Sequence, residues 1–158
     1  MKSELMGIKT SISAEVAHML NILLADEFLL YTKTRNAHWN VIGHDFYSKH
    51  TFFEMQYRQL EEICDEIAER VRTLGHYAIA TMQNFLKVTH LSEVSREHND
   101  SRGYVKELLE GHESIIIFIR ENITRFAIEM RDAGTSDFVT GIMETHEKMA
   151  WMLRAHLE

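Results

Sequence analysis

The stretch FYSKHTFFEMQYRQLEEICDEIAERVRTLG, residues 46–75, decides how this chain folds. Its apolar and aromatic positions recur at alternating steps of four and three residues, at Phe46, His50, Phe53, Tyr57, Leu60, Cys64, Ile67, Val71 and Leu74. That spacing places one continuous stripe along one face of an α-helix. Gly75 follows the last stripe residue, where glycine commonly ends a helix. The pattern therefore predicts one long amphipathic helix that ends at Gly75.

Three further stripes with the same spacing predict three more long helices. The first begins at a serine cap, Ser11 or Ser13, and runs to about Trp39. The third begins at the cap candidates of residues 99–101 and ends at Gly134. The fourth starts on the two hydroxyl residues that follow Gly134 and reaches nearly to the end of the chain.

The connections between these helices indicate the topology. The first and last links are only a few residues long, which makes the joined helices antiparallel neighbours. The middle connection, residues 75–100, is about 25 residues long, so we expect structure within it, namely a short extra helix at residues 92–97. The sequence predicts an all-α four-helix bundle of two antiparallel hairpins joined by a crossover, in a single domain of residues 1–158.

Composition excludes several classes of protein. The 158 residues carry 17 basic against 24 acidic side chains, a net charge of −7, which argues against a globally basic nucleic-acid binder. Cys64 is the single cysteine, so neither an intrachain disulfide nor a zinc site of several thiolates can form. No apolar run approaches the ~20 residues of a bilayer span, and the start lacks a signal-peptide pattern. We expect a cytoplasmic protein with no membrane partner.

Two histidines lie on the apolar stripes at one end of the first hairpin. His38 lies seven residues after Tyr31, and His50 lies near the start of the second helix. A tight turn that contains Gly43 separates them, so antiparallel packing brings both to the same end. Two imidazoles there could share one cation. Each histidine taken alone is better explained as a core residue with one hydrogen bond.

An acidic strip flanks the second stripe. It comprises Glu54, Glu61, Asp65 and Glu69. Such a strip is commonly a solvated face, and Asp65 lies 15 residues beyond His50, about 22 Å along a straight helix, too far for one metal within a chain. Two copies of the helix, antiparallel about a two-fold axis near residues 57–60, would bring each histidine pair to the partner's Asp65 and the partner's Glu69. This arrangement predicts two composite sites per dimer.

The charge of such a site favours a bound cation. Two carboxylates ~6 Å apart repel by about 3 kcal/mol at an effective dielectric of ~20. A site that holds Glu54, Asp65 and Glu69 should therefore protonate or recruit a cation. Imidazole and carboxylate together suit Fe(II), Mn(II) or Zn(II), and composition does not choose among these metals.

Two runs of sequence carry a likeness to a known family: HWNVxGxxFxxxH at residues 38–50 and DEIAER at residues 65–70. They resemble the Dps family, the mini-ferritins named as DNA-binding proteins from starved cells, and the likeness covers essentially the whole chain. It implies a ferritin-like bundle assembled as a hollow dodecamer, built from two-fold dimers with ferroxidase centres at the two-folds. It also implies that Fe(II) is oxidised, preferentially by hydrogen peroxide, and stored as a ferric mineral, which protects against oxidative stress.

The resemblance implies a role for each candidate residue. His38 and His50 match the histidine ligands of one subunit, whereas Asp65 and Glu69 match the acids that its partner supplies. Glu54 stands where the family usually has aspartate, and its extra methylene bears on the second iron position. Trp39 resembles the aromatic residue beside the centre that scavenges oxidising equivalents, or else it simply packs at the hairpin end.

Three acids predict an entry route for cations. Asp132, Asp137 and Glu144 lie at or after the end of the third predicted helix, and the last two are seven residues apart on one helical face. A ring of such acids about a three-fold axis would form a pore that funnels cations. The plainer alternative is ordinary surface charge, with Glu144 paired to Lys148.

Other histidines are expected to have structural roles. Glu15 and His18 form a single Glu-x-x-His motif, which the larger ferritins use in pairs inside the bundle, so we expect surface or capping residues. His112 and His146 lie on stripes without recognisable acidic partners, so we expect core or cavity histidines.

Binding of DNA should be weak or absent at physiological salt. The N-terminal arm offers only Lys2 and Lys9, with Glu4 between them, and nonspecific binding scales with the number of phosphates neutralised.

Two other classes of function stay open. One is a non-catalytic architectural, DNA-associated or surface-recognition shell, and the other is an oxygen-carrying or zinc-binding bundle with its metal inside one chain.

Overall fold

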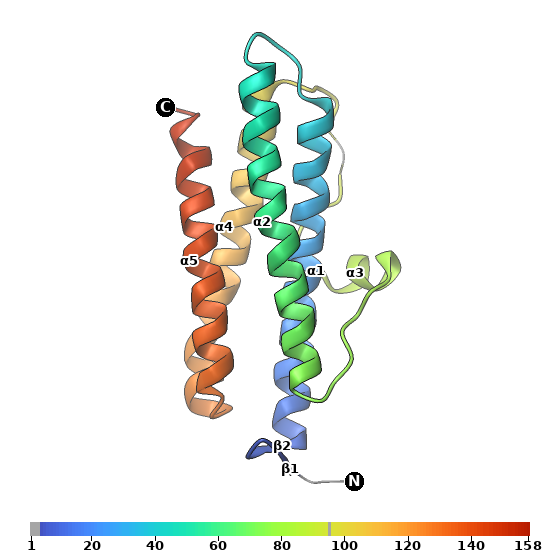
Figure 1. Ribbon diagram of the computed structural model, residues 1–158, viewed down its shortest axis with the longest axis vertical. Helices are drawn as coiled ribbons and strands as arrows, with labels where there is room; N and C mark the ends of the chain where they lie inside the picture. The colour runs from blue at the N-terminus through green and yellow to red at the C-terminus, as the bar shows by residue number, and fades with distance from the viewer. Residues whose placement is uncertain (1–3, 95) are drawn as a thin grey trace.

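Long helices make up most of the chain (Figure 1). The computed structural model describes residues 4–94 and 96–158, and its long helices are α1 (Thr10–Asn40), α2 (Phe46–Thr73), α4 (Ser101–Thr124) and α5 (Ala133–Ala155). Helices α1 and α2 form one antiparallel hairpin, α4 and α5 form the other, and the two hairpins lie side by side. The predicted all-α four-helix bundle is confirmed.

The end of α2 follows from its sequence. Gly75 adopts φ +87°, and its N–H donates to the carbonyl of Arg72 over 2.9 Å, while the N–H of His76 donates to the carbonyl of Val71 over 3.2 Å. These two bonds satisfy carbonyls that a helix end otherwise leaves unpaired. A Cβ on Gly75 would also lie 2.9 Å from the Leu5 side chain. Glycine is therefore required both by the backbone conformation and by the close packing.

The crossover contains a short helix, as predicted, but at a different place. Helix α3 spans Met82–Val88, and the Thr81 hydroxyl caps it by accepting from the N–H of Asn84. The helix expected at residues 92–97 is wrong, because the described residues of that segment are not helical. The ring of Phe85 stacks on Phe28 of α1 with centroids 4.7 Å apart, which holds α3 against the bundle.

The turn between α4 and α5 differs from the prediction. Helix α4 continues into a π-helix, η1 (Arg125–Glu129), and Arg131 then reverses the chain with φ +53°. Asp132 caps α5 by accepting from the N–H of Thr135 over 2.9 Å. Gly134 lies in the first turn of α5, so its predicted role as a helix stop is wrong, and the hydroxyl residues after it are not the cap. The Asp132 carboxylate also pairs with Arg70, which holds it at the start of α5.

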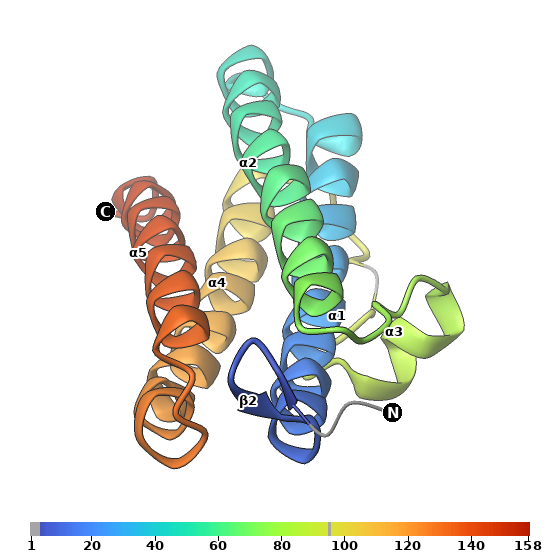
Figure 2. The same ribbon diagram turned by 60° about the horizontal axis from the view of Figure 1, so that its bottom comes forward.

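A small β-hairpin precedes α1, which periodicity did not predict. Strand β1 (Glu4–Leu5) pairs antiparallel with β2 (Ile8–Lys9), beside the start of α1 (Figure 2). Lys9 occupies the cap position of α1, so the predicted serine caps are wrong. Lys2, the other lysine of the arm, lies outside the described residues.

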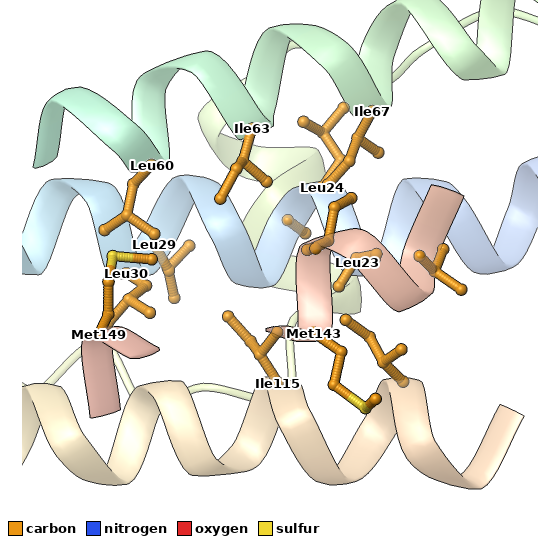
Figure 3. Packing of buried hydrophobic residues seen from close by; sticks show 14 of the residues in the cluster. Leu23, Leu24, Leu29, Leu30, Leu60, Ile63, Ile67, Ile115, Met143 and Met149 are labelled. Carbon is orange, nitrogen blue, oxygen red and sulfur yellow. The ribbon is translucent and has the colours of Figure 1, made fainter. Parts of the chain in front are cut away.

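The apolar stripes of the four long helices meet in one core (Figure 3). Leu30 of α1, Leu60 of α2, Ile115 of α4 and Met149 of α5 are at most 1% exposed. Full burial of such a side chain stabilises the fold by about 1.5–3 kcal/mol. Among the described residues, no helix combines the length and the apolar character that crossing a membrane would need.

Candidate metal centre

His38 and His50 face each other at the end of the α1–α2 hairpin, the upper end in Figure 1. Their rings stack with centroids 3.8 Å apart and planes 17° from parallel. His38 lies near the end of α1 and is buried, whereas His50 lies near the start of α2 and is partly exposed. The structure thus brings together two candidate ligands that are 12 residues apart in the sequence.

Two reciprocal hydrogen bonds set the tautomer of both rings. Nδ1 of His38 lies 2.7 Å from the carbonyl of His50, and Nδ1 of His50 lies 2.7 Å from the carbonyl of His38. A carbonyl can only accept, so each Nδ1 carries a proton and donates it. In the neutral ring, Nε2 then has a lone pair, and within the described residues neither Nε2 has a hydrogen bond. This orientation through the other ring nitrogen is typical of metal-binding histidine.

Aromatic rings support the pair on both sides. Tyr57 packs edge-on against His38 with centroids 5.2 Å apart, and Phe46 stacks on His50 at the same separation. The guanidinium of Arg35 lies over the ring of Tyr57 at 4.2 Å and over that of Trp39 at 5.6 Å. Trp39 itself is 66% exposed, and its ring lies beside the Arg35 guanidinium. The aromatic surroundings limit the motion of both imidazoles.

Glu54 lies one turn beyond His50 on α2. Its Oε1 accepts from Nε of Arg58 over 3.1 Å and from Nη2 of Arg58 over 2.5 Å. The hydrogen bond from Arg58, and then the charges of Arg58 and the two histidines, lower the pKa of Glu54 below its ordinary value. The carboxylate is therefore ionised at neutral pH, which is the form that binds metal.

Asp65 and Glu69 lie one turn apart on the exposed face of α2. Asp65 lines an open groove of about 730 Å³ whose walls include Phe28 of α1 and Phe85 of α3. Burial raises the pKa of the neighbouring Cys64 thiol far above its ordinary value, so this sulfur stays protonated and is not a thiolate ligand. Asp65 and His50 are on one continuous helix, about 22 Å apart by helical rise.

One chain therefore holds the candidate ligands in two separate groups. Within residues 4–94 and 96–158, no three His, Cys, Asp or Glu side chains converge to hold a metal. His38, His50 and Glu54 gather at one end of α2, and Asp65 and Glu69 lie farther along it. A donor set of two imidazoles and up to three carboxylates suits Fe(II) only if a second copy of the helix supplies the missing half.

The three candidate pore acids have different surroundings. Asp132 is 3% exposed, caps α5 and lies 3.2 Å from Nη2 of Arg70, so its carboxylate is already paired. Asp137 and Glu144 are exposed on α5. Across the described part of the chain, no ion pair joins Glu144 to Lys148. Asp137 and Glu144 are thus the two acids that face solvent.

The Glu-x-x-His motif of α1 faces solvent. Glu15 and His18 are both exposed, and Glu15 forms an ion pair with Arg125 at the start of η1. Their predicted surface placement is confirmed.

His112 and His146 meet in the centre of the bundle, and both are fully buried, which confirms their prediction as core histidines. Their Nδ1 atoms are 2.8 Å apart, and burial, followed by the charge of His146, holds the pKa of His112 well below its ordinary value. Glu27, also fully buried, lies 2.8 Å from Nε2 of His146, so the expectation of no acidic partner is wrong. A charged residue at a core step between Leu23 and Leu30 was the signal for it.

Residues 17–158 match the family model described as a ferritin-like domain. The chain is 34% identical over 143 residues to DNA protection during starvation protein 2 of Bacillus anthracis, covering 90% of this chain and 97% of that protein. The chain belongs to the Dps family of ferritin-like proteins.

A solved structure agrees with this assignment. The crystal structure of the Dps protein from Vibrio cholerae O1, described as a member of a broad superfamily of ferritin-like diiron-carboxylate proteins, matches with a TM-score of 0.93 and 33% identity. The match covers all of this chain and 98% of that one. A Nostoc protein named as an uncharacterized low temperature-induced protein is 45% identical over 90% of this chain and 80% of its own length.

Proposed function

We propose that this Dps-family protein sequesters iron by oxidising Fe(II) at sites shared between two subunits. Family membership supports iron storage and oxidative protection as the general function. The observation that carries the finer proposal is the reciprocal bonding of His38 and His50, which leaves an Nε2 lone pair on each ring beside the ionised Glu54. Fe(II) and hydrogen peroxide are the substrates, and neither zinc nor manganese is proposed.

Each residue has a defined role in this proposal. His38 and His50 bind Fe(II) through Nε2, and the partner's Asp65 and the partner's Glu69 complete the coordination. Glu54 binds a second iron. A two-fold axis near the middle of α2 repeats every contact, so each dimer has two such sites. Homo-oligomerisation, with a dodecameric shell as its final form, is therefore part of the proposed mechanism.

Oxidation at a pair of irons avoids the release of a hydroxyl radical. Two Fe(II) ions each give one electron to hydrogen peroxide, the O–O bond breaks, and two protons complete the formation of two water molecules. A single Fe(II) would instead release a hydroxyl radical, for which the exposed Trp39 is the proposed scavenger. Asp137 and Glu144 are the proposed acids of the entry pore, and the enclosed cavity stores the ferric product.

Complementation between inactive subunits tests the shared site. His50→Ala and Asp65→Ala should each slow peroxide-dependent Fe(II) oxidation at least tenfold, in stopped-flow measurements after anaerobic Fe(II) loading. When the two variants are refolded together, half of the dimers are mixed, and each mixed dimer has one intact site. About a quarter of wild-type activity should return.

The control is a mixture of the same variants assembled separately, with the oligomer's mass measured alongside. Equal activity in the two mixtures, or unchanged oxidation in either single variant, would contradict the shared site.

Binding of DNA is predicted to be weak or absent, although relatives are named for DNA protection. The chain carries a net charge of −7, and Lys9 lies in the β-hairpin next to the acidic Glu4 strand. A gel shift of linear DNA at physiological salt checks this point, and a clear shift would show that the prediction is wrong.

A further inference from the structure

Arg58 lies one turn beyond Glu54 on α2, on the side of the helix that carries His50. Two nitrogens of its guanidinium contact Glu54, and both contacts fall on Oε1, at 3.1 Å from Nε and 2.5 Å from Nη2. The Arg58 side chain is 67% exposed, whereas that of Glu54 is 33% exposed. A positively charged side chain of the protein itself thus pairs with the Glu54 carboxylate, which lies beside the two histidines.

Two physical effects compete at this contact. As a positioning group, the guanidinium would hold the carboxylate ready for metal, as hydrogen-bond partners of ligands often do. As a fixed positive charge, it would oppose a second cation. An exposed pair is held weakly, so little orientation is gained from it. By contrast, a divalent ion about 6 Å from one positive charge loses about tenfold in affinity even at the dielectric constant of water. Repulsion is the larger effect.

We infer that Arg58 tunes the metal affinity of the iron site: it pairs with Glu54 as a built-in cation and lowers the affinity of the Glu54 position for divalent metal. An ion that binds through Oε1 must displace the guanidinium. Arg58 thereby sets the concentration of divalent cation at which the second position fills. This inference rests on the proposed function, because it requires metal binding at His38 and His50.

Anaerobic titration with Co(II) tests the inference on the assembled protein. Co(II) suits nitrogen and oxygen ligands, and its visible absorption reports coordination without any oxidation step. In Arg58→Gln, the Co(II) ion that depends on Glu54 should bind about tenfold more tightly than in the wild type. Arg58→Lys, which keeps the charge but loses the planar fork, should bind like the wild type. The gain should shrink at 0.5 M salt, where the Debye length is only about 4 Å.

Two controls isolate the contact. The gain from Arg58→Gln should disappear in a Glu54→Gln background, because the carboxylate is then neutral. Arg154→Gln removes another exposed arginine, one that pairs with Glu113 on the other hairpin, and should leave Co(II) affinity unchanged.

The outcomes separate this inference from the proposed function. Unchanged or weaker Co(II) binding in Arg58→Gln would overturn the inference, and weaker binding in both Arg58 variants would identify the residue as a positioning group. If His50→Ala keeps wild-type Co(II) binding, the proposed function itself fails. If His50→Ala loses that binding while Arg58→Gln titrates like the wild type, only the inference fails.

Discussion

His38 and His50 stack at the turn end of the α1–α2 hairpin, whereas His112 and His146 meet in the middle of the bundle with no exposed surface. In the first pair, both Nδ1 atoms donate to backbone carbonyls, and both Nε2 atoms stay available. In the second pair, His146 uses one nitrogen toward His112 and the other toward Glu27.

The difference shows how surroundings assign roles to the same side chain. Backbone carbonyls bind one nitrogen of each ring at the hairpin end, so the lone pairs of His38 and His50 can reach a ligand. In the core, the ring nitrogens of His146 point to opposite neighbours and do not converge. Several buried polar atoms there, including Nε2 of His112 and both carboxylate oxygens of Glu27, lack a hydrogen bond of good geometry. The core group is therefore sensitive to substitution.

The largest expected effect is at Glu27. Glu27→Ala removes the carboxylate 2.8 Å from the buried His146 ring and leaves a cavity, and a large-to-small change in a core typically costs about 2–5 kcal/mol. We expect the free energy of unfolding, from urea denaturation at fixed protein concentration, to fall by that amount. Glu15→Ala, at an exposed ion pair, is the matched control and should change it by less than about 1 kcal/mol. A loss at Glu27 no larger than at Glu15 would show that the buried contact is unimportant.

The second prediction separates the functional role of the His38–His50 pair from the structural role of the His112–His146 pair. His50→Asn should slow Fe(II) oxidation at least tenfold, equivalent to about 1.4 kcal/mol, with a smaller effect on unfolding. His112→Asn should do the reverse, because its ring packs in the core and touches no proposed ligand. Stopped-flow oxidation and urea denaturation of both variants provide the comparison. Slower oxidation in a fully folded His112→Asn protein would contradict the separation of roles.

The third prediction concerns acidification. Burial lowers the pKa of His112 in the folded chain well below 6.5, its ordinary value, so below about pH 6.5 the unfolded chain binds a proton that the folded chain does not. Stability is therefore fully present above pH 6.5 and falls on acidification, by about 1.4 kcal/mol per pH unit for one proton, until the folded pKa is reached.

Unfolding measured between pH 7 and pH 5 checks this slope, and His112→Asn serves as the control. The variant should show a shallower dependence by one proton. Identical slopes in the two proteins would mean that another group controls acid stability.

The smallest effect is expected at His90, a half-exposed histidine that pairs with a buried carboxylate. Its side chain is 49% exposed, and its Nδ1 lies 2.9 Å from the buried carboxylate of Asp26. His90→Ala leaves Asp26 bonded to the Thr89 hydroxyl and to the backbone N–H of residue 90. We expect a loss of about 1 kcal/mol in unfolding free energy, and a loss as large as that of Glu27→Ala would remove the distinction between half-buried and buried pairs.

Helix ends set by neighbouring residues were predictable from the sequence, whereas features set by contacts between distant residues were not. The end of α2 at Gly75 was predictable because the bonds that form it join residues within two turns. The start of α5 was not, since Asp132 is favoured as its cap by Arg70, 62 residues away. The position of α3 likewise depends on Phe28, which no seven-residue pattern reveals. Glu27 was visible as a charge on an apolar stripe, but its partner was not.

The sequence by itself determined the four amphipathic helices, their pairing into hairpins and the meeting of His38 with His50, because periodicity and short links act along the chain. Only the tertiary structure decided which nitrogen of each ring is held and that Glu27 pairs with His146. These choices depend on angles and distances between side chains of separate turns or helices. A repeat of three and four residues places a side chain on a face but does not select its partner there.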